Sequence, residues 1–331
     1  MATIKEVAKA AGVSVMTASR VARGMEGVRE STRKNVLEVM KNLGYQPNRL
    51  ARALRNNHSN TIGIVVADVK NSFYMQVNAL IEQRLRAKGF SVLVSFSNED
   101  MEMEMSGLSM LWGARVDGII ITPVHRNDTQ VSDFLQNHDF PVLQLYRNVY
   151  DQIDSLSIDD RYGVKLATRR LLEEGHCRIL LLDVNWEGRA DGYRAAFAEH
   201  GLAVDERFIL SFGTNAFVED EVMENINRLH PTAIVAGTNI LGYATITACH
   251  KLMMEIPQDM SVIIQDDIPW VSLMDITAIS QPMNRIAQES VDIILKKIMD
   301  KDEQAKDTVI HKYIRPSLIE RASVVSLGSK Q

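Results

Sequence analysis

Residues 3–24, TIKEVAKAAGVSVMTASRVARG, determine how the N-terminal part of the chain folds. Thr3 and Glu6 form a capping-box pattern, and apolar residues then recur at helical spacing until the helix breaker Gly12. Ser14 is placed to cap a second short helix with a thin apolar face. Two short helices joined by a tight turn predict a helix-turn-helix, in which the start of the second helix faces base edges in the DNA major groove.

A third amphipathic segment runs from about Ser31 to Gly44, so the region is predicted to be an all-α domain of three short helices. A helix that lies on a membrane surface would need a wide and bulky apolar face. These segments lack such a face. Nucleic acid is therefore favoured over a membrane as the partner of this region.

Charge is divided unevenly along the chain. The 331 residues carry a formal net charge of -5, but residues 1–60 hold eleven Lys or Arg against four acidic residues, a net charge of +7. The rest of the chain therefore carries -12. A basic module attached to an acidic body indicates that the module meets a polyanion and the body does not.

The composition, 46% hydrophobic and 24% charged, is that of a folded globular protein. There is no run of 18 apolar residues, and the N-terminus carries charges where a signal peptide needs an apolar core, so we expect a cytoplasmic protein without membrane association. Cys177 and Cys249 lie in no metal-binding spacing, and both are expected to be buried thiols. No metal and no cofactor is expected.

From Thr61 onward, short β-branched runs alternate with helical patterns, and the series restarts with ILLLDV at 179–184. Such alternation predicts parallel sheets with helices on both faces, built as two doubly wound halves. In open α/β sheets the ligand lies beyond the carboxyl ends of the strands. Ten residues follow predicted strands closely and can bind hydroxyl groups or cover a flat ring: Asn71, Ser72, Phe73, Tyr74, Arg147, Trp186, Arg189, Asn239, Asp266 and Gln281.

The whole chain resembles the lactose-repressor and galactose-repressor family of bacterial transcription regulators. The resemblance is carried by TIKEVAKAAGVSVMTASRVARG and, in the same order as in the family, by SIDDRYGVKLATRRLLEEGHCRI, GRADGYRAAFAEHGL, PTAIVAGTN, IPQDMSVI and ISQP. It implies a helix-turn-helix domain joined to a periplasmic-binding-protein-like α/β domain of two doubly wound subdomains. It also implies a homodimer, or a dimer of dimers, that binds operator DNA under the control of a small effector.

This organisation predicts three parts of the chain: a DNA-binding domain over 1–46, a hinge helix and linker over 47–60, and an effector-binding and dimerisation domain over 61–331. We expect the N-subdomain of the last part to comprise about 61–157 and 283–312. The C-subdomain is then expected to comprise about 158–282 and 313–331.

By resemblance, the DNA contacts fall on the N-terminal helices and the hinge, with the apolar Leu54 wedged into the minor groove. They are Thr3, Ser14, Val15, Met16, Thr17, Arg20, Asn48, Leu54 and Arg55. The effector positions carried over from the family are Ser72, Phe73, Arg189, Asn239, Asp266 and Gln281. The chain departs from the family at Ile264-Gln265, where a Gly-aromatic pair is usual, and at Ile240, where an Asp is common.

We therefore expect a repressor whose operator affinity is modulated by a sugar, a sugar acid or a sugar derivative, or as a second choice by a nucleobase. The alternative is a cytosolic sugar- or nucleobase-binding protein without a specific role on DNA, which leaves the basic helix-turn-helix segment unexplained. An enzyme is not expected and no catalytic residue is assigned, because P-loop, HExxH and GxSxG motifs are all missing. A nonspecific DNA-packaging protein would have no use for an effector cleft.

Overall fold

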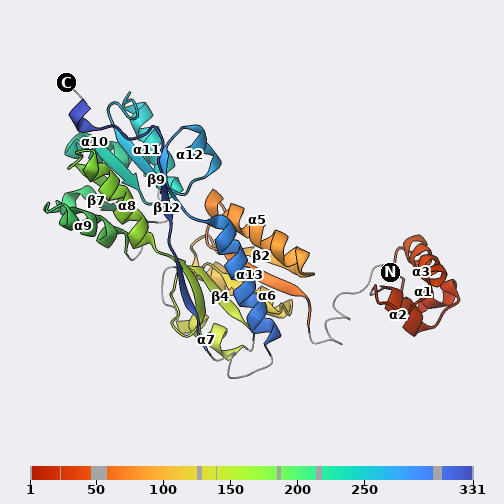
Figure 1. The fold of residues 1–331 in the computed structure, drawn as a ribbon. Helices are drawn as coiled ribbons and strands as arrows, with labels where there is room; N and C mark the ends of the chain where they lie inside the picture. Colours follow the sequence, from red (N-terminus) through yellow and green to blue (C-terminus); the bar gives the residue numbers. More distant parts are fainter. Residues whose placement is uncertain are drawn as a thin grey trace. The chain divides into compact units, whose positions relative to one another are not determined.

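The computed structural model describes residues 2–22, 24–45, 58–124, 129–138, 140–184, 188–213, 218–300 and 308–329. The chain forms two compact units, Met1–Asn60 and Thr61–Gln331. Figure 1 shows helices in the first unit, and strands with covering helices in the second.

The N-terminal unit contains α1 (Ile4–Ala11), α2 (Val15–Ala22) and α3 (Glu30–Asn42). The capping box is present, because Thr3 N donates to Glu6 Oε2 over 2.6 Å and Glu6 N donates to Thr3 Oγ1 over 3.3 Å. Gly12 ends α1 in the left-handed region, at φ 65°. The small core of the unit contains Val7, Ala18 and Val36, so that all three helices share it and the predicted helix-turn-helix is confirmed.

The described part of the second unit contains two six-stranded sheets. The strands of the first sheet are parallel, in the order β11-β5-β4-β3-β1-β2. They are β1 (Thr61–Val66), β2 (Ser91–Phe96), β3 (Gly118–Ile121), β4 (Val142–Tyr146), β5 (Asp154–Ile158) and β11 (His311–Ile314). The helices around this sheet are α5 (Ser72–Ala87), α6 (Met101–Gly113), α7 (Thr129–Asn137) and α13 (Met283–Met299). We call this part the first half of the unit.

Alternation along β1 explains why helices cover both faces of the first sheet. Ile62 and Ile64 belong to the core that includes α5 and α13. Val65 belongs to the core that includes α6 and α7. Since successive side chains of a strand point to opposite faces, a continuous apolar run serves both layers.

The second half of the unit is built around the second sheet, in the order β12-β10-β9-β8-β6-β7, with only β12 antiparallel to its neighbour. Its strands are β6 (Ile179–Asp183), β7 (Ile209–Ser211), β8 (Ala233–Ala236), β9 (Ser261–Gln265), β10 (Thr277–Ser280) and β12 (Ser317–Ile319). Its helices are α8 (Asp160–Glu173), α9 (Arg189–Glu199), α10 (Glu219–Leu229), α11 (Asn239–Lys251) and α12 (Pro269–Leu273), with short 3-10 turns η1 (Glu206–Phe208) and η2 (Leu327–Ser329).

Close packing of α8 on α9 positions the start of α9 near the carboxyl ends of the strands. Gly192 allows this contact, because a Cβ atom at this position would lie 2.1 Å from the carbonyl oxygen of Arg161. Any larger residue would push the two helices apart. The described chain passes between the two sheets after β5, after β10 and after β11.

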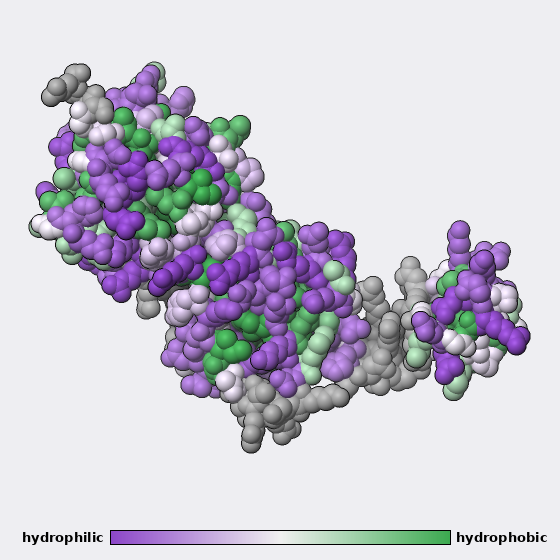
Figure 2. Space-filling view, viewed as in Figure 1, coloured by the Kyte–Doolittle hydropathy of each residue, from purple (hydrophilic) through white to green (hydrophobic). Residues whose placement is uncertain are grey.

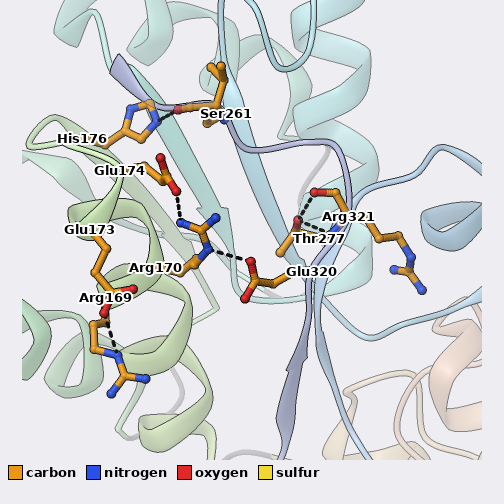
Figure 3. A network of polar contacts seen from close by, with 10 residues as sticks. Arg169, Arg170, Glu173, Glu174, His176, Ser261, Thr277, Glu320 and Arg321 are labelled. Carbon is orange, nitrogen blue, oxygen red and sulfur yellow. Dashed lines mark hydrogen bonds and ion pairs between the residues drawn. The ribbon is translucent and has the colours of Figure 1, made fainter. Parts of the chain in front are cut away.

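The C-terminal segment, residues 320–329, is held on the second half by a polar network (Figure 3). Arg170 of α8 is paired with Glu174 and with Glu320, the latter over 2.8 Å. Deeper in the structure, His176 Nε2 donates to the carbonyl of Val325 over 2.9 Å, and His176 Nδ1 lies 3.0 Å from Thr232 Oγ1.

One expectation about the cysteines is wrong. Cys249 is buried, but Cys177 is exposed. Cys177 lies in the connection before β6, next to the buried His176. Because neighbouring side chains of an extended segment point in opposite directions, the inward orientation of His176 turns Cys177 outward.

Candidate functional site

The start of α2 is exposed on the N-terminal unit. Ser14 Oγ accepts a hydrogen bond from Thr17 N over 3.0 Å and so caps the helix. The side chains of Val15, Met16 and Arg20 are exposed, with 71% of Met16 open to solvent. Figure 2 shows mostly hydrophilic residues on the visible face of this unit. Two exposed apolar side chains beside a polar cap and an arginine suit contact with thymine methyl groups and a guanine edge.

Four sequence-predicted positions lie outside the described residues. They are Asn48, Leu54 and Arg55 of the predicted hinge, and Trp186 of the predicted cleft. Thr3 is described and caps α1.

A cavity lies among the ends of the two sheets in the second unit and consists of two adjoining pockets, which we call the cleft. The first pocket has an empty volume of about 430 Å³ and the second about 470 Å³. Both volumes include space that is open to solvent. The first is lined by Asn71, Phe73, Tyr74, Tyr146, Arg147, Ile158, Asp160, Arg189, Thr238, Gln265, Asp266 and Gln281.

The first half contributes an aromatic wall to the cleft. Tyr74 and Tyr146 are stacked, with ring centroids 4.8 Å apart and planes at 19°, and Phe73 lies 5.4 Å from Tyr146. Tyr146 ends β4 in the left-handed backbone region, at φ 71°, a strained conformation for an aromatic residue. Its hydroxyl is buried and has no hydrogen-bond partner among the described residues. Burial raises the pKa of the Tyr146 phenol well above its ordinary value.

Side-chain amides hold a carboxylate at the centre of the cleft. Asn239 Nδ2 donates to Asp266 Oδ2 over 2.7 Å and to Asn71 Oδ1 over 2.9 Å, while Gln281 Nε2 donates to Asp266 Oδ1 over 2.6 Å. Asn71 belongs to the first half and the other three residues belong to the second, so this chain of bonds crosses the cleft. Gln281 Oε1 is buried without a described partner.

Asp266 follows β9 with φ 76°, a left-handed conformation that turns its carboxylate into the cleft. Burial raises the pKa of Asp266 to about 6, against the opposing effects of the Asn239 hydrogen bond and of Arg189. Strain and a perturbed pKa in one cavity are typical of functional positions.

Arg189 begins α9 and is buried beside two carboxylates. Its Nη2 lies 2.7 Å from Asp160 Oδ2, and its Nη1 lies 3.3 Å from Asp183 Oδ1. Gln265 connects the group, because its Oε1 accepts from Arg189 Nε over 3.3 Å and its Nε2 donates to Asp160 Oδ1 over 3.0 Å. Burial raises the pKa of the Asp160 carboxyl, although Arg189 opposes this.

Arg147 lies on the opposite wall, where both pockets meet. It is paired with Glu99 through two nitrogens, one of them 2.9 Å from Glu99 Oε2, and its Nη1 donates to the carbonyl of Pro123 over 2.5 Å. The second pocket continues from there and is lined by Asp68, Asn71, Tyr74, Glu99, Arg147, Val184, Gly213, Val218, Thr238, Ile240 and Leu241. Ile240, where the family commonly has an Asp, makes part of this pocket apolar.

The fold brings most of the predicted cleft residues together. Asn71, Phe73, Tyr74, Arg147, Arg189, Asp266 and Gln281 line the first pocket, and Asn239 is bonded to two of them. Ser72 lies in the first turn of α5 and does not line either pocket. Sequence reasoning missed Tyr146, Asp160, Thr238 and Gln265.

Two of these residues had a signal in the sequence. Tyr146 is the last residue of a predicted strand, and Asp160 belongs to the family-like segment SIDDRYG, before which no strand is predicted. Gln265 stood out only as a departure from the family. Its two bonds to Arg189 and Asp160 give the substitution a structural role.

The described ranges contain no group of three or more His, Cys, Asp or Glu side chains arranged to hold a metal ion. No described helix has both the length and the apolar character needed to span a bilayer.

Comparison with known proteins identifies the same two parts of the chain. Residues 3–48 match the model described as bacterial regulatory proteins, lacI family, and residues 59–317 match periplasmic binding proteins and sugar binding domain of LacI family. The HTH-type transcriptional repressor PurR of Vibrio cholerae serotype O1 (strain M66-2) is 30% identical over 340 residues, which cover 99% of each chain.

Solved structures agree with the fold. The lac repressor dimer bound to operator and the anti-inducer ONPF has a TM-score of 0.83 at 24% identity, covering 98% of this chain and 99% of that one. The complex of the transcriptional regulator CelR with cellobiose has a TM-score of 0.69 at 24% identity, covering 98% and 100%. With a helix-turn-helix, a two-sheet ligand-binding body and family models that match nearly its whole length, the chain belongs to the LacI family of bacterial transcription regulators.

Proposed function

We propose that this protein represses transcription by binding an operator as a homodimer, and that a hydroxyl-rich small molecule in the cleft releases it from DNA. The observation that carries the proposal is the presence, in one chain, of an exposed α2 start on a basic unit and of a polar, aromatic-walled cleft. Neither a simple ligand-binding protein nor a simple DNA-packaging protein needs both.

On the DNA side, the start of α2 reads base edges. Met16, Thr17 and Arg20 enter the major groove, Val15 supports them, and Thr3 and Ser14 lie near the phosphates. The sequence alone assigns Asn48, Leu54 and Arg55 to a hinge helix in the minor groove. One such module reads too few bases to select one site among about 10⁶ genomic positions, so two modules act together in a symmetric dimer.

On the effector side, the aromatic wall covers a ring and the polar residues bind hydroxyl groups. We assign this role to Asn71, Phe73, Tyr74, Arg147, Arg189, Asn239, Asp266 and Gln281, and we add Tyr146. The solved structure of the relative CelR is a complex with cellobiose, which supports a sugar-like ligand over a nucleobase.

The protein acts in the cytoplasm, where its DNA lies, and it is not an enzyme. Both ring nitrogens of His176 are engaged by Thr232 and Val325. His176 is therefore not available as the base that would activate the thiol of the neighbouring Cys177.

The proposal is tested by selecting double-stranded DNA with the full chain and then titrating selected and random DNA at several KCl concentrations. We expect binding of the selected sequence to exceed binding of random DNA by roughly 10³-fold or more at moderate salt. A ratio near one at every salt concentration would contradict a sequence-specific role, because electrostatic binding to phosphates alone gives no preference.

A further inference from the structure

Among the described residues, the cleft contains more carboxylates than cations. Of the charged residues that line its two pockets, two are guanidinium groups, whereas four are carboxylates, and Asp183 adds a fifth through Arg189. The acids are Asp68, Glu99, Asp160, Asp183 and Asp266. Whether the cleft accepts an anion depends on what each arginine already binds.

Arg189 is already engaged with acids of the chain. Its two terminal nitrogens contact Asp160 and Asp183, and its Nε donates to Gln265. Only 7% of its side chain is exposed. A ligand carboxylate that approached Arg189 would have to displace an intramolecular carboxylate and leave that group buried without its cationic partner, which is unfavourable.

Arg147 is engaged in the same way on the other wall. Glu99 contacts both terminal nitrogens of Arg147, and the Pro123 carbonyl accepts a further hydrogen bond from Arg147. The side chains of Arg147 and Glu99 are 3% and 6% exposed. The two lining arginines therefore serve to neutralise acids of the protein.

Asp266 remains without an ion pair among the described residues. Its oxygens receive bonds from the amides of Asn239 and Gln281, and its pKa is raised to about 6 by burial. Each carboxylate oxygen can accept a further hydrogen bond, and Gln281 Oε1 is an unmatched acceptor beside it. A ligand bound in this part of the cleft must therefore donate hydrogen bonds.

We propose that the cleft selects an uncharged ligand with several hydroxyl groups and rejects anions such as sugar acids and sugar phosphates. This inference rests on the proposed role of the cleft as the effector site. The ligand donates hydroxyl hydrogens to Asp266 and Gln281, and one hydroxyl bonds with Tyr146, whose hydroxyl has no described partner. The sugar acids that sequence reasoning allowed are thereby removed from the expected effectors.

The first experiment compares matched pairs by thermal shift and calorimetry on the full chain. The pairs are D-glucose and D-gluconate, D-galactose and D-galacturonate, and D-ribose and D-ribose 5-phosphate, all at equal ionic strength. We expect any neutral sugar that binds to do so at least tenfold more tightly than its acidic partner. An acidic member that binds more tightly than its neutral partner would overturn the proposal.

The second experiment needs no known effector. The double variant Asp160→Asn and Asp183→Asn replaces both acids beside Arg189 with uncharged amides of nearly the same shape. Titration with inorganic phosphate and with D-gluconate, against KCl of equal ionic strength, is expected to stabilise this variant saturably and to leave the wild type unchanged. The control variant Asp191→Asn and Asp205→Asn removes the same charge from exposed acids paired with Arg194 and Arg207, and it is expected to behave as the wild type.

Saturable stabilisation of the wild type by phosphate or gluconate would contradict anion rejection. So would a double variant that is folded by circular dichroism but gains no anion binding. If the double variant does not fold, the single variant Asp183→Asn takes its place, with a smaller gain expected. Operator binding is measured on the same wild-type sample. A failure to bind DNA would refute the proposed function, whereas the preference for neutral over anionic ligands is judged from the titrations alone.

Discussion

At the scale of single residues, we expect the Tyr146 hydroxyl to contribute to effector binding and not to the stability of the fold. Its hydroxyl is buried without a described partner, so Tyr146→Phe removes a polar group that contributes no intramolecular bond. We expect the free energy of unfolding to stay the same or to rise by up to about 1 kcal/mol.

The same substitution should weaken binding of a hydroxyl-bearing effector by roughly three- to tenfold, the value of one ordinary hydrogen bond. Urea unfolding and calorimetry measure the two effects. Tyr243→Phe is the control, because Tyr243 is 62% exposed. A loss of stability in Tyr146→Phe, or unchanged affinity, would show that the hydroxyl bonds to the protein and not to the ligand.

Asp266 predicts a particular dependence of stability on pH. Its pKa is about 6 in the folded protein and about 3.9 in the unfolded chain. Between these values the folded state binds more protons than the unfolded state, so the contribution of Asp266 lowers stability as pH rises and is fully unfavourable above pH 6. The size of this effect is about 3 kcal/mol.

The variant Asp266→Asn lacks the titration, and Gln281 can turn its unmatched Oε1 toward the new amide. Its free energy of unfolding relative to wild type should rise between pH 4 and about pH 6 and then level off. Denaturant titrations at half-unit steps of pH measure the difference. Parallel profiles for the two proteins would mean that Asp266 does not titrate in this range.

At the scale of elements, the hydrophobic periodicity of the sequence predicted those helices and strands that are held by burial of apolar side chains. The capping box, the helix-turn-helix and the alternation of β1 follow from local sequence. In contrast, β5 has the sequence DSLSI and all five residues are buried. It was not predicted, because Asp154 is paired with Lys297, 3.2 Å away and far along the chain. Asp160, which begins α8 shortly after this strand, was missed because the strand before it was not predicted.

Contacts of His176 and of Arg170 both hold the C-terminal segment (Figure 3). His176 is 1% exposed and bonds to the Val325 carbonyl and to Thr232. Arg170 is 25% exposed in its pairs with Glu174 and Glu320. Burial makes an unmatched carbonyl costly, whereas partly exposed ion pairs contribute little.

We therefore expect His176→Ala to lower the free energy of unfolding by about 2 to 4 kcal/mol, from an unmatched carbonyl and a cavity. Arg170→Ala should lower it by less than about 1 kcal/mol. Urea unfolding of both variants tests this order. The reverse order would mean that the surface network holds the segment and the histidine does not.

At the scale of the whole molecule, DNA reading and effector binding belong to separate compact units. The N-terminal unit has its own core, and the cleft residues all lie beyond Asn60. Coupling between the two functions must obey linkage: an effector that weakens operator binding by a given factor is itself bound more weakly on the operator by the same factor. A substitution in one unit can then weaken binding by that unit without changing the intrinsic affinity of the other unit for its own ligand.

Arg20→Ala tests this separation from the DNA side. Arg20 is exposed on α2, and loss of a bidentate guanine contact should cost about 1 to 3 kcal/mol and relax specificity at one operator position. Effector affinity without DNA, and the factor by which the effector weakens operator binding, should both stay at their wild-type values. Competition titrations on operators changed one base pair at a time, with and without effector, measure all three quantities. Equal losses on operator and random DNA would place Arg20 on a phosphate, and a changed effector affinity would mean that the two units are not independent.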